Sequence, residues 1–302
     1  MPDFRTVMSA YGLRPRDVVP DGLWHRCPTD DHPTKRNGAY LLRVDGRMGW
    51  FKNFAIDDGF SSWALEGEFT PAQRIKAAAD TSAAREREAQ YRHASVASCR
   101  TYWASLKPVR SGHPYLEAKK LDMLGCTGVR VDGALLVIPV MRNGLVMSVQ
   151  TIAADGQKRF RSGCPVKGGT YVLDRPGATL TCFTEGFATG LAVFASLKQA
   201  RVVVCFDAGN LVEVATHFKG SGLGVVCADN DHETAARIGT NKGMESGHKA
   251  AGALGCGIAY PEGIRGSDWA DAMAEREDGR RWIARQIMNK AKPFRYVERA
   301  VA

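Results

Sequence analysis

The sequence predicts an α/β protein (α+β overall), in which a parallel sheet near the C-terminus follows a β-rich basic segment and a small antiparallel β module. From about residue 178, the apolar runs TLTCFTE, RVVVCFD and LGVVCAD alternate with segments of helical length that carry Gly or Ala. Such alternation is typical of βαβ units, whose strands are buried on both faces. Upstream, apolar runs are joined by Gly or Asn-Gly turns, which indicate hairpins. The 302 residues, 44% of them hydrophobic, suffice for two compact units.

Residues 1–68 predict the small antiparallel module. AYLLRV and GWFKNF are expected strands, joined by a tight turn at residues 44–47. The spacing of His25, Cys27 and His32 resembles the opening of a zinc ribbon, which needs four ligands from two turns. The second turn offers only Asp57 or Asp58, so we expect no Zn²⁺ but a degenerate, ribbon-like fold. A core of aromatic side chains would replace the metal, and it would consist of Trp24, Tyr40, Trp50, Phe51, Phe54 and Trp63. The alternative is that these side chains stack on nucleic-acid bases.

Two further segments lie before the parallel sheet. Residues 69–104 are Ala- and charge-rich, with Thr70 as N-cap and Pro71 at the first helical position, and predict a helical connector. Residues 105–177 predict a β-rich subdomain, in which Asn143-Gly144 between two apolar runs is the strongest hairpin signal of the chain.

Composition excludes several classes of protein. No apolar run approaches the ~18 residues of a membrane span, and the N-terminal residues lack the apolar core of a secretory signal. The eight cysteines are scattered and include no C-x-x-C, as expected of buried thiols in a reducing compartment such as the cytoplasm. The formal net charge of +9 favours a polyanionic partner.

Acidic residues follow each strand of the predicted parallel sheet, where ligands of open α/β sheets bind. Glu185 follows the first strand, Asp207 the second, and Asp229 and Asp231 the third, while a loop after the fourth carries Asp268 and Asp271. Converging carboxylates raise one another's pKa unless a cation lies between them. Mg²⁺ prefers such oxygen ligands and bridges to phosphate, so the set predicts phosphoryl or nucleotidyl transfer. Each residue could instead be a helix N-cap, a role that Asp207 fits well.

The segments TEGFATGLA, FDAGN, ADND and GSDWAD together resemble the Toprim domain of bacterial-type primases, topoisomerases and some nucleases. The resemblance covers residues 178–275, with a basic C-terminal helix or tail at 276–302. It implies that Glu185, Asp229 and Asp231 are catalytic and bind Mg²⁺ or Mn²⁺, helped by Asp268 and Asp271. Replicative primases usually carry another Asp four residues after the Glu, whereas this chain has Thr189.

Basic residues upstream are the candidate nucleic-acid contacts. In a strand, Lys158 and Phe160 face one side while Arg159 and Arg161 face the other. Cations beside an aromatic ring suit a single-stranded template, although an edge strand protected by charge is an equal alternative. Lys167, Lys119 and Lys120 would extend this surface. In the loop after the third strand, Asn241 and Lys242 are candidate contacts for a nucleotide triphosphate.

The resemblance extends upstream, where HPYLEAKKLDM and the following runs look like the half that precedes Toprim in phage and plasmid primases. It implies a cytoplasmic DNA primase (in the host cytoplasm if phage-encoded) that makes RNA primers from NTPs on single-stranded DNA and uses no membrane. The sequence lacks a P-loop, so a helicase partner would be a separate protein. The alternatives are a Toprim nuclease that cuts DNA and a non-catalytic, primase-derived protein that binds nucleic acid or inhibits a host complex.

Overall fold

The computed structural model describes residues 2–56, 59–65, 70–109, 112–123 and 125–295. The chain forms two compact units, Met1–Ala94 and Ser95–Ala302, which are described separately. The predicted ligands Asp57 and Asp58 lie outside the described residues. Throughout the described ranges, no helix is long and apolar enough to cross a membrane.

The first unit is a short helix on an antiparallel sheet. Helix α1 (Phe4–Ala10) is followed by β1 (His25–Cys27), β2 (Gly38–Leu42), β3 (Met48–Asn53) and β4 (Ser61–Ala64), paired in sequence order. One sheet face and α1 form an apolar core that includes Phe4, Met8, Leu13, Tyr40, Phe51 and Trp63.

The predicted aromatic core of this unit is only partly right. Tyr40, Phe51 and Trp63 are buried, but Trp24 and Phe54 are exposed by 49% and 37%. Trp24 precedes β1 and Phe54 follows β3, so neither has the strand alternation that turns Phe51 inward. Trp24 packs instead on Phe60, with ring centroids 4.7 Å apart, and Phe54 lies under the Arg26 guanidinium at 4.3 Å.

Helix α2 (Pro71–Ser105) starts at the expected proline and runs from the first unit into the second. It has little apolar character along most of its length. Among its described side chains Ala84 is buried, and near the C-terminal end Cys99 is fully buried. Cys99 packs with Val137, Val146 and Val149 of a β-sheet.

That sheet has five antiparallel strands among the residues described. They are paired in sequence order, with helix α3 (Pro114–Ala118) between the first two: β5 (Lys107–Pro108), β6 (Arg130–Asp132), β7 (Leu135–Arg142), β8 (Leu145–Ile152) and β9 (Lys158–Phe160). The predicted hairpin at Asn143-Gly144 joins β7 to β8. Both residues have positive φ, 51° and 75°, as a type I′ turn requires.

The remainder of the second unit, so far as it is described, is built on a six-stranded sheet. Its strands are β10 (Tyr171–Leu173), β11 (Leu180–Thr184), β12 (Ala200–Val204), β13 (Leu223–Cys227), β14 (Gly257–Ala259) and β15 (Lys292–Pro293). They lie in the order β10-β12-β11-β13-β14, and β15 also pairs with β13. Strands β11 to β14 are parallel, whereas β10 and β15 are antiparallel additions. The predicted α/β fold class is thus confirmed.

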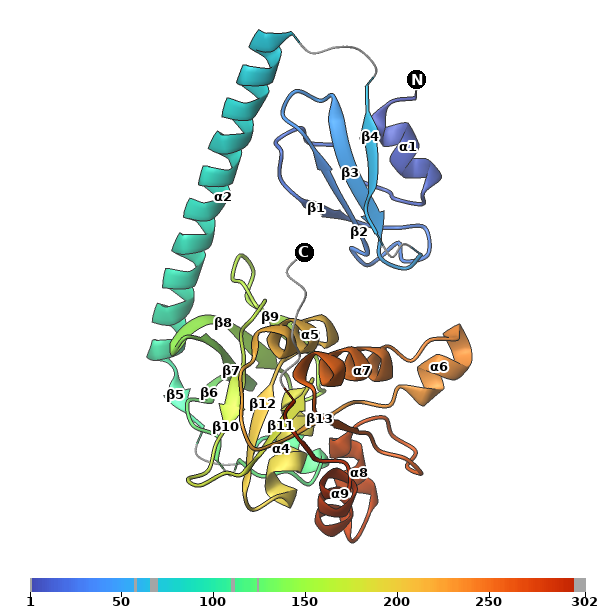
Figure 1. Cartoon of the computed structure of the whole chain (residues 1–302). Helices are drawn as coiled ribbons and strands as arrows, with labels where there is room; N and C mark the ends of the chain where they lie inside the picture. The colour runs from blue at the N-terminus through green and yellow to red at the C-terminus, as the bar shows by residue number, and fades with distance from the viewer. Residues whose placement is uncertain (1, 57–58, 66–69, 110–111, 124, 296–302) are drawn as a thin grey trace. The chain divides into compact units, whose positions relative to one another are not determined.

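Helices cover both faces of this sheet (Figure 1). On one face lie α4 (Phe187–Ser196), α8 (Trp269–Glu275) and α9 (Gly279–Met288), whose apolar side chains share a core with the sheet. On the other face lie α5 (Ala208–His217) and α7 (Lys242–Leu254), which form a second core. The short α6 (His232–Ile238) precedes α7. Because parallel strands β11, β12 and β13 end level with one another, the loops that follow them meet at one edge.

Candidate active site

Carboxylates gather at the carboxyl edge of the six-stranded sheet. Glu185 follows β11 and Asp229 and Asp231 follow β13, as the sequence predicts. Burial, and then the charges of Asp231 and Asp207, raise the pKa of Glu185 to about 7. Burial, followed by the charges of Asp268, Glu185 and Asp231, raises the pKa of Asp229 well above its usual range. These groups therefore lie close enough to repel one another, which is the electrostatic condition that a bound cation relieves.

Asp207 has the N-cap role considered for it, and it also faces Glu185. Its Oδ1 accepts a hydrogen bond from the Asn210 backbone N–H at 2.8 Å, at the start of α5. The preceding residue, Phe206, has a φ of 75°, a left-handed conformation that costs an aromatic residue about 1–3 kcal/mol. This bend turns the chain between β12 and α5 and brings Asp207 to the carboxyl edge of the sheet. We call this edge, with Glu185, Asp207, Asp229 and Asp231, the acidic rim; there the charge of Asp207 raises the pKa of Glu185.

Asn241 holds the Asp229–Asp231 loop against the start of α7. Asn241 Oδ1 accepts from the backbone N–H groups of Asp231 (3.2 Å) and Met244 (3.1 Å), and its amide donates to Asn230 Oδ1 at 2.9 Å. The structure thus places this predicted nucleotide contact as a clamp on the loop. Lys242, beside it, is exposed.

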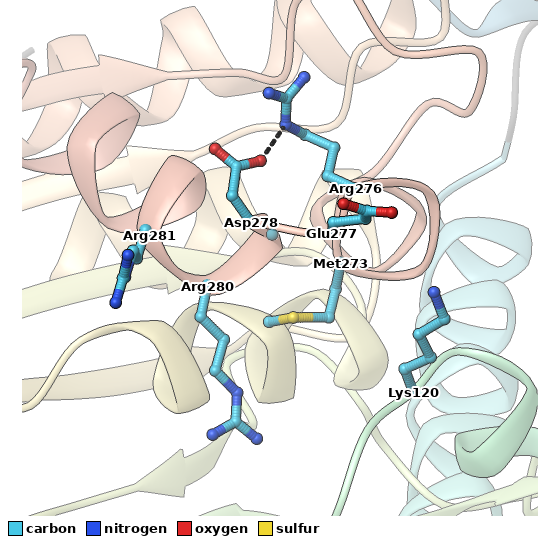
Figure 2. Close-up of a pocket in the computed structure, with 8 residues that line it drawn as sticks. Lys120, Met273, Arg276, Glu277, Asp278, Arg280 and Arg281 are labelled. Carbon is cyan, nitrogen blue, oxygen red and sulfur yellow. Dashed lines mark hydrogen bonds and ion pairs between the residues drawn. The ribbon is translucent and has the colours of Figure 1, made fainter.

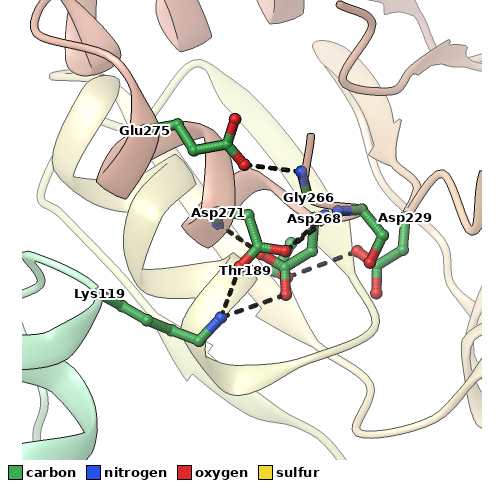
Figure 3. A network of polar contacts seen from close by, with 8 residues as sticks. Lys119, Thr189, Asp229, Gly266, Asp268, Asp271 and Glu275 are labelled. Atoms are coloured by element: carbon green, nitrogen blue, oxygen red, sulfur yellow. Dashed lines mark hydrogen bonds and ion pairs between the residues drawn. The ribbon is translucent and has the colours of Figure 1, made fainter. Parts of the chain in front are cut away.

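Asp268 and Asp271 lie at the start of α8 and form a capping box (Figure 3). Both also pair with Lys119, whose Nζ lies 2.9 Å from Asp271 Oδ1 and 3.8 Å from Asp268 Oδ2. Burial alone would lower the pKa of Lys119, but the two carboxylates raise it. Burial likewise favours a higher pKa for Asp271, yet the hydrogen bond from Lys119 and those from backbone N–H groups lower it overall. For Asp268, burial prevails and raises the pKa.

Thr189, on α4, is fully buried below the rim. Its hydroxyl lies 3.4 Å from Asp229 Oδ1 and donates a long hydrogen bond to it. At the position where the resemblance leads us to expect a carboxylate, the chain therefore offers a neutral donor to the central aspartate.

The predicted alternation of basic and aromatic residues on β9 is present. Lys158 faces the carboxylates. Its Nζ lies close to Gly186, the residue after Glu185, since a methyl group at Gly186 would stand 3.8 Å from it. Phe160, on the same side, packs edge-on against Phe206 with ring centroids 6.0 Å apart. The charge of Lys158 lowers the pKa of Glu185, opposing the effect of burial.

The other face of β9 turns toward α2. The Arg161 guanidinium lies 4.6 Å from the centre of the Tyr102 ring, and it donates to Ser98 Oγ at 3.3 Å. Arg159 is exposed on the strand between Lys158 and Phe160. Of the predicted template contacts on and beside β9, the structure therefore brings Lys158 to the carboxylates, whereas Arg159 and Arg161 lie elsewhere.

Lys167 lies apart from β9, in the turn before β10. Its Nζ pairs with Glu213 Oε2 at 3.3 Å. The buried amide of Asn210 anchors this turn by accepting from the Gly168 N–H (2.7 Å) and donating to the carbonyls of Gly169 (2.8 Å) and Cys205 (2.7 Å). This anchor was not predicted, because an asparagine inside an apolar helix gives no sign of distant partners.

The predicted zinc residues each have a different partner. His25 Nε2 lies 2.9 Å from Asp21 Oδ1, and its ring stacks on Tyr40. The Cys27 thiol is buried, which raises its pKa. His32 Nδ1 contacts the carbonyl oxygen of Asp31.

The donor set at the acidic rim fits a hard divalent cation. Its ligands would be carboxylate oxygens, which Mg²⁺ and Mn²⁺ prefer, and neighbouring carboxylates add to the effect of burial in raising the pKa values of Glu185 and Asp229. In the described part of the chain, no three His, Cys, Asp or Glu side chains are already arranged to hold a metal ion. A bound ion would therefore have to draw these side chains together.

A hollow of about 570 Å³ lies beside the loop between α8 and α9 (Figure 2). Its lining includes four cationic residues, Lys120, Arg276, Arg280 and Arg281. Arg276 pairs with Asp278 at 3.0 Å, and Arg280 lies 3.4 Å from Asp122. The hollow includes none of the rim carboxylates.

Comparison with known proteins supports the assignment of the sheet. Residues 181–278 match the family of Toprim domains. A chain in the structure of the bacteriophage T7 lagging-strand DNA polymerase, interacting with primase domains bound to an RNA/DNA hybrid and dTTP, is 14% identical. It has a TM-score of 0.42, with 60% of this chain and 92% of that chain covered. The primase fragment of the bacteriophage T7 primase-helicase protein is 16% identical, with a TM-score of 0.39 and coverage of 61% and 78%. The predicted Toprim resemblance is thus confirmed by the family match over residues 181–278, which carry Glu185, Asp229 and Asp231 at the carboxyl edge of the sheet.

Proposed function

We propose that this protein is a primase-type nucleotidyltransferase that makes short RNA primers on single-stranded DNA. The observation that supports this most strongly is the position of Lys158. A cation from the β-rich segment faces the carboxylates of a Toprim domain, so a site for a divalent ion and a site for a polyanion adjoin each other. Nucleotidyl transfer needs both, because the metal and the phosphates must be held side by side.

The residues of the rim would have different roles according to their charge. Glu185, Asp229 and Asp231 would hold Mg²⁺ or Mn²⁺, with Asp268 next to Asp229. When bound, such an ion stabilises negative charge on the attacking and leaving oxygens. Lys158 would attract the triphosphate or the template phosphates to this edge, and exposed Lys242 would add a second cation. Exposed Arg159 would contact the template backbone along β9.

The partners that follow from this proposal are NTPs and single-stranded DNA, and the setting is the cytoplasm. A replicative helicase that opens the duplex is a further proposed partner.

Dinucleotide formation on single-stranded DNA tests the proposal. Asp229→Asn and Glu185→Gln should each abolish metal-dependent synthesis, because each removes a negative ligand while keeping the shape of the side chain. DNA binding should persist in both variants. Asp155→Asn is the matched control, since Asp155 is exposed and the amide keeps the acceptor that caps the Gln157 N–H.

Three outcomes separate this function from its rivals. Extension that requires NTPs supports the primase, whereas cleavage of labelled DNA without NTPs would identify a nuclease using the same carboxylates. A biological function that survives both substitutions but is lost on reversing the charges at residues 158–161 would identify a non-catalytic nucleic-acid-binding protein.

A further inference from the structure

The two carboxylates at the start of α8 already have protein partners for their oxygens. Asp271 Oδ1 accepts from Lys119, and Asp271 Oδ2 accepts from the backbone N–H groups of Ser267 (3.0 Å) and Asp268 (3.4 Å). Asp268 Oδ1 accepts from the Asp271 N–H at 2.8 Å, and Asp268 Oδ2 faces Lys119 Nζ at 3.8 Å. A metal ion bound here would have to compete with an ammonium group for the same oxygens (Figure 3).

This ion pair adjoins the central aspartate of the rim. The backbone N–H of Asn230, the residue after Asp229, donates to the carbonyl oxygen of Ser267, the residue before Asp268, at 2.7 Å. Lys119 therefore compensates the carboxylate of Asp268, whose loop is hydrogen-bonded to the loop of Asp229. Lys158 acts on both Asp229 and Glu185.

The hydrogen bond between Thr189 and Asp229 also argues against a second divalent ion. Two divalent ions held about 4 Å apart need carboxylates that bridge or flank both of them. Thr189 provides a hydroxyl donor to Asp229 Oδ1 instead of a further negative charge. Next to Asp229 the chain thus has the ion pair of Lys119 with Asp268 and a neutral donor from Thr189, where a second divalent ion would require free carboxylates.

We propose that the Lys119 ammonium is a built-in cation that takes the place of a second divalent ion beside Asp229, so that the site binds one ion, between Glu185, Asp229 and Asp231. The inference rests on the proposed function, because it concerns the metal site of that reaction. Lys119 is a positioning residue in this scheme: it fixes Asp268 and Asp271 and compensates part of their negative charge.

Counting bound Mn²⁺ on the full chain tests the inference without any turnover. Titration followed by electron paramagnetic resonance and by calorimetry should give one ion for the unchanged protein. Lys119→Met leaves Asp268 and Asp271 uncompensated and should raise the count to two, whereas Lys119→Arg, which keeps the charge, should leave it at one. Lys120→Met is the matched control, since Lys120 is the exposed neighbour of Lys119, and it should also leave the count at one.

Thermal unfolding without metal verifies that each variant is folded, and Lys119→Gln, which can still donate to Asp271, replaces Lys119→Met if the latter is not. Two ions on the unchanged protein would overturn the inference and leave the proposed function standing. One ion on a folded Lys119→Met or Lys119→Gln variant would also overturn it. Absence of any bound ion on the unchanged protein would overturn the proposed function as well.

Discussion

Gly243 lies directly against the backbone of Asp229. A methyl group at Gly243 would stand 2.6 Å from the Asp229 carbonyl oxygen and 3.1 Å from Asp231 Oδ2. Real Cβ atoms do not approach backbone this closely, so the first turn of α7 can touch the Asp229–Asp231 loop only because this residue has no side chain. The position of both aspartates depends on this contact and on the Asn241 clamp.

Gly243→Ala should therefore displace the loop and reduce primer synthesis on the order of a hundredfold, as a misplacement of about 1 Å does at a reacting centre. Gly252→Ala, in the same helix, has open space around its new methyl group. It should keep activity and gain about 0.5–1 kcal/mol from helix propensity. Rates of dinucleotide formation and urea unfolding measure the two effects; equal rates in both variants would show that the contact does not position the carboxylates.

The raised pKa of Glu185 makes stability depend on pH. Folding raises this pKa from 4.5 to about 7, so between these values the folded chain keeps a proton that the unfolded chain has lost. The contribution to stability is complete below pH 4.5, declines as the pH rises to about 7, and is then lost. In EDTA at pH 8, Glu185→Gln should consequently be more stable than the unchanged protein, by at most about 3 kcal/mol.

Urea unfolding at pH 5 and pH 8 checks this expectation. The advantage of Glu185→Gln should shrink toward pH 5, and exposed Glu233→Gln should follow the unchanged protein at both values. An advantage that grows toward low pH would contradict the assigned direction.

Lys158 should act on the carboxylates while its neighbour Arg159 does not. Because the charge of Lys158 lowers the pKa of Glu185, Lys158→Met should move that pKa further upward. Arg159→Met removes an equal charge from the adjacent residue of β9 and should leave it unchanged. Carbon-13 NMR titration of the Glu185 carboxyl group distinguishes the two, and identical titration curves in both variants would refute the placement of Lys158 at the rim.

Asn210→Ala should destabilise the second unit by about 2–4 kcal/mol, because it leaves a buried N–H and two buried carbonyls without their partner. Exposed Asn289→Ala, at the end of α9, should change the free energy of unfolding by less than about 0.5 kcal/mol. Denaturant titration measures both, and a similar small change in the two variants would contradict the anchoring role of Asn210.

The acidic rim could be predicted from sequence because parallel strands bring residues to a common edge whatever the lengths of the helices between them. This rule alone predicts that Glu185, Asp229 and Asp231 lie at the same edge of the sheet. The partner of Asp271 could not be found in this way: Lys119 is 152 residues distant, and its ion pair depends on how α3 packs. In the N-terminal unit, hydrophobicity alone could not tell that Trp24 and Phe54 lie outside the strands whose alternation buries Tyr40 and Phe51.

Negative and positive charges at the rim come from different parts of the second unit. Glu185, Asp229 and Asp231 follow strands β11 and β13, whereas Lys158 belongs to β9 and Lys119 to the end of α3. A fragment beginning at residue 178 would keep the anions and lose both counter-charges, so its own repulsion would oppose folding at neutral pH. The segment that carries α3 and β9 is thus an electrostatic complement of the six-stranded sheet, and a stable fragment that contains this sheet must begin before Lys119.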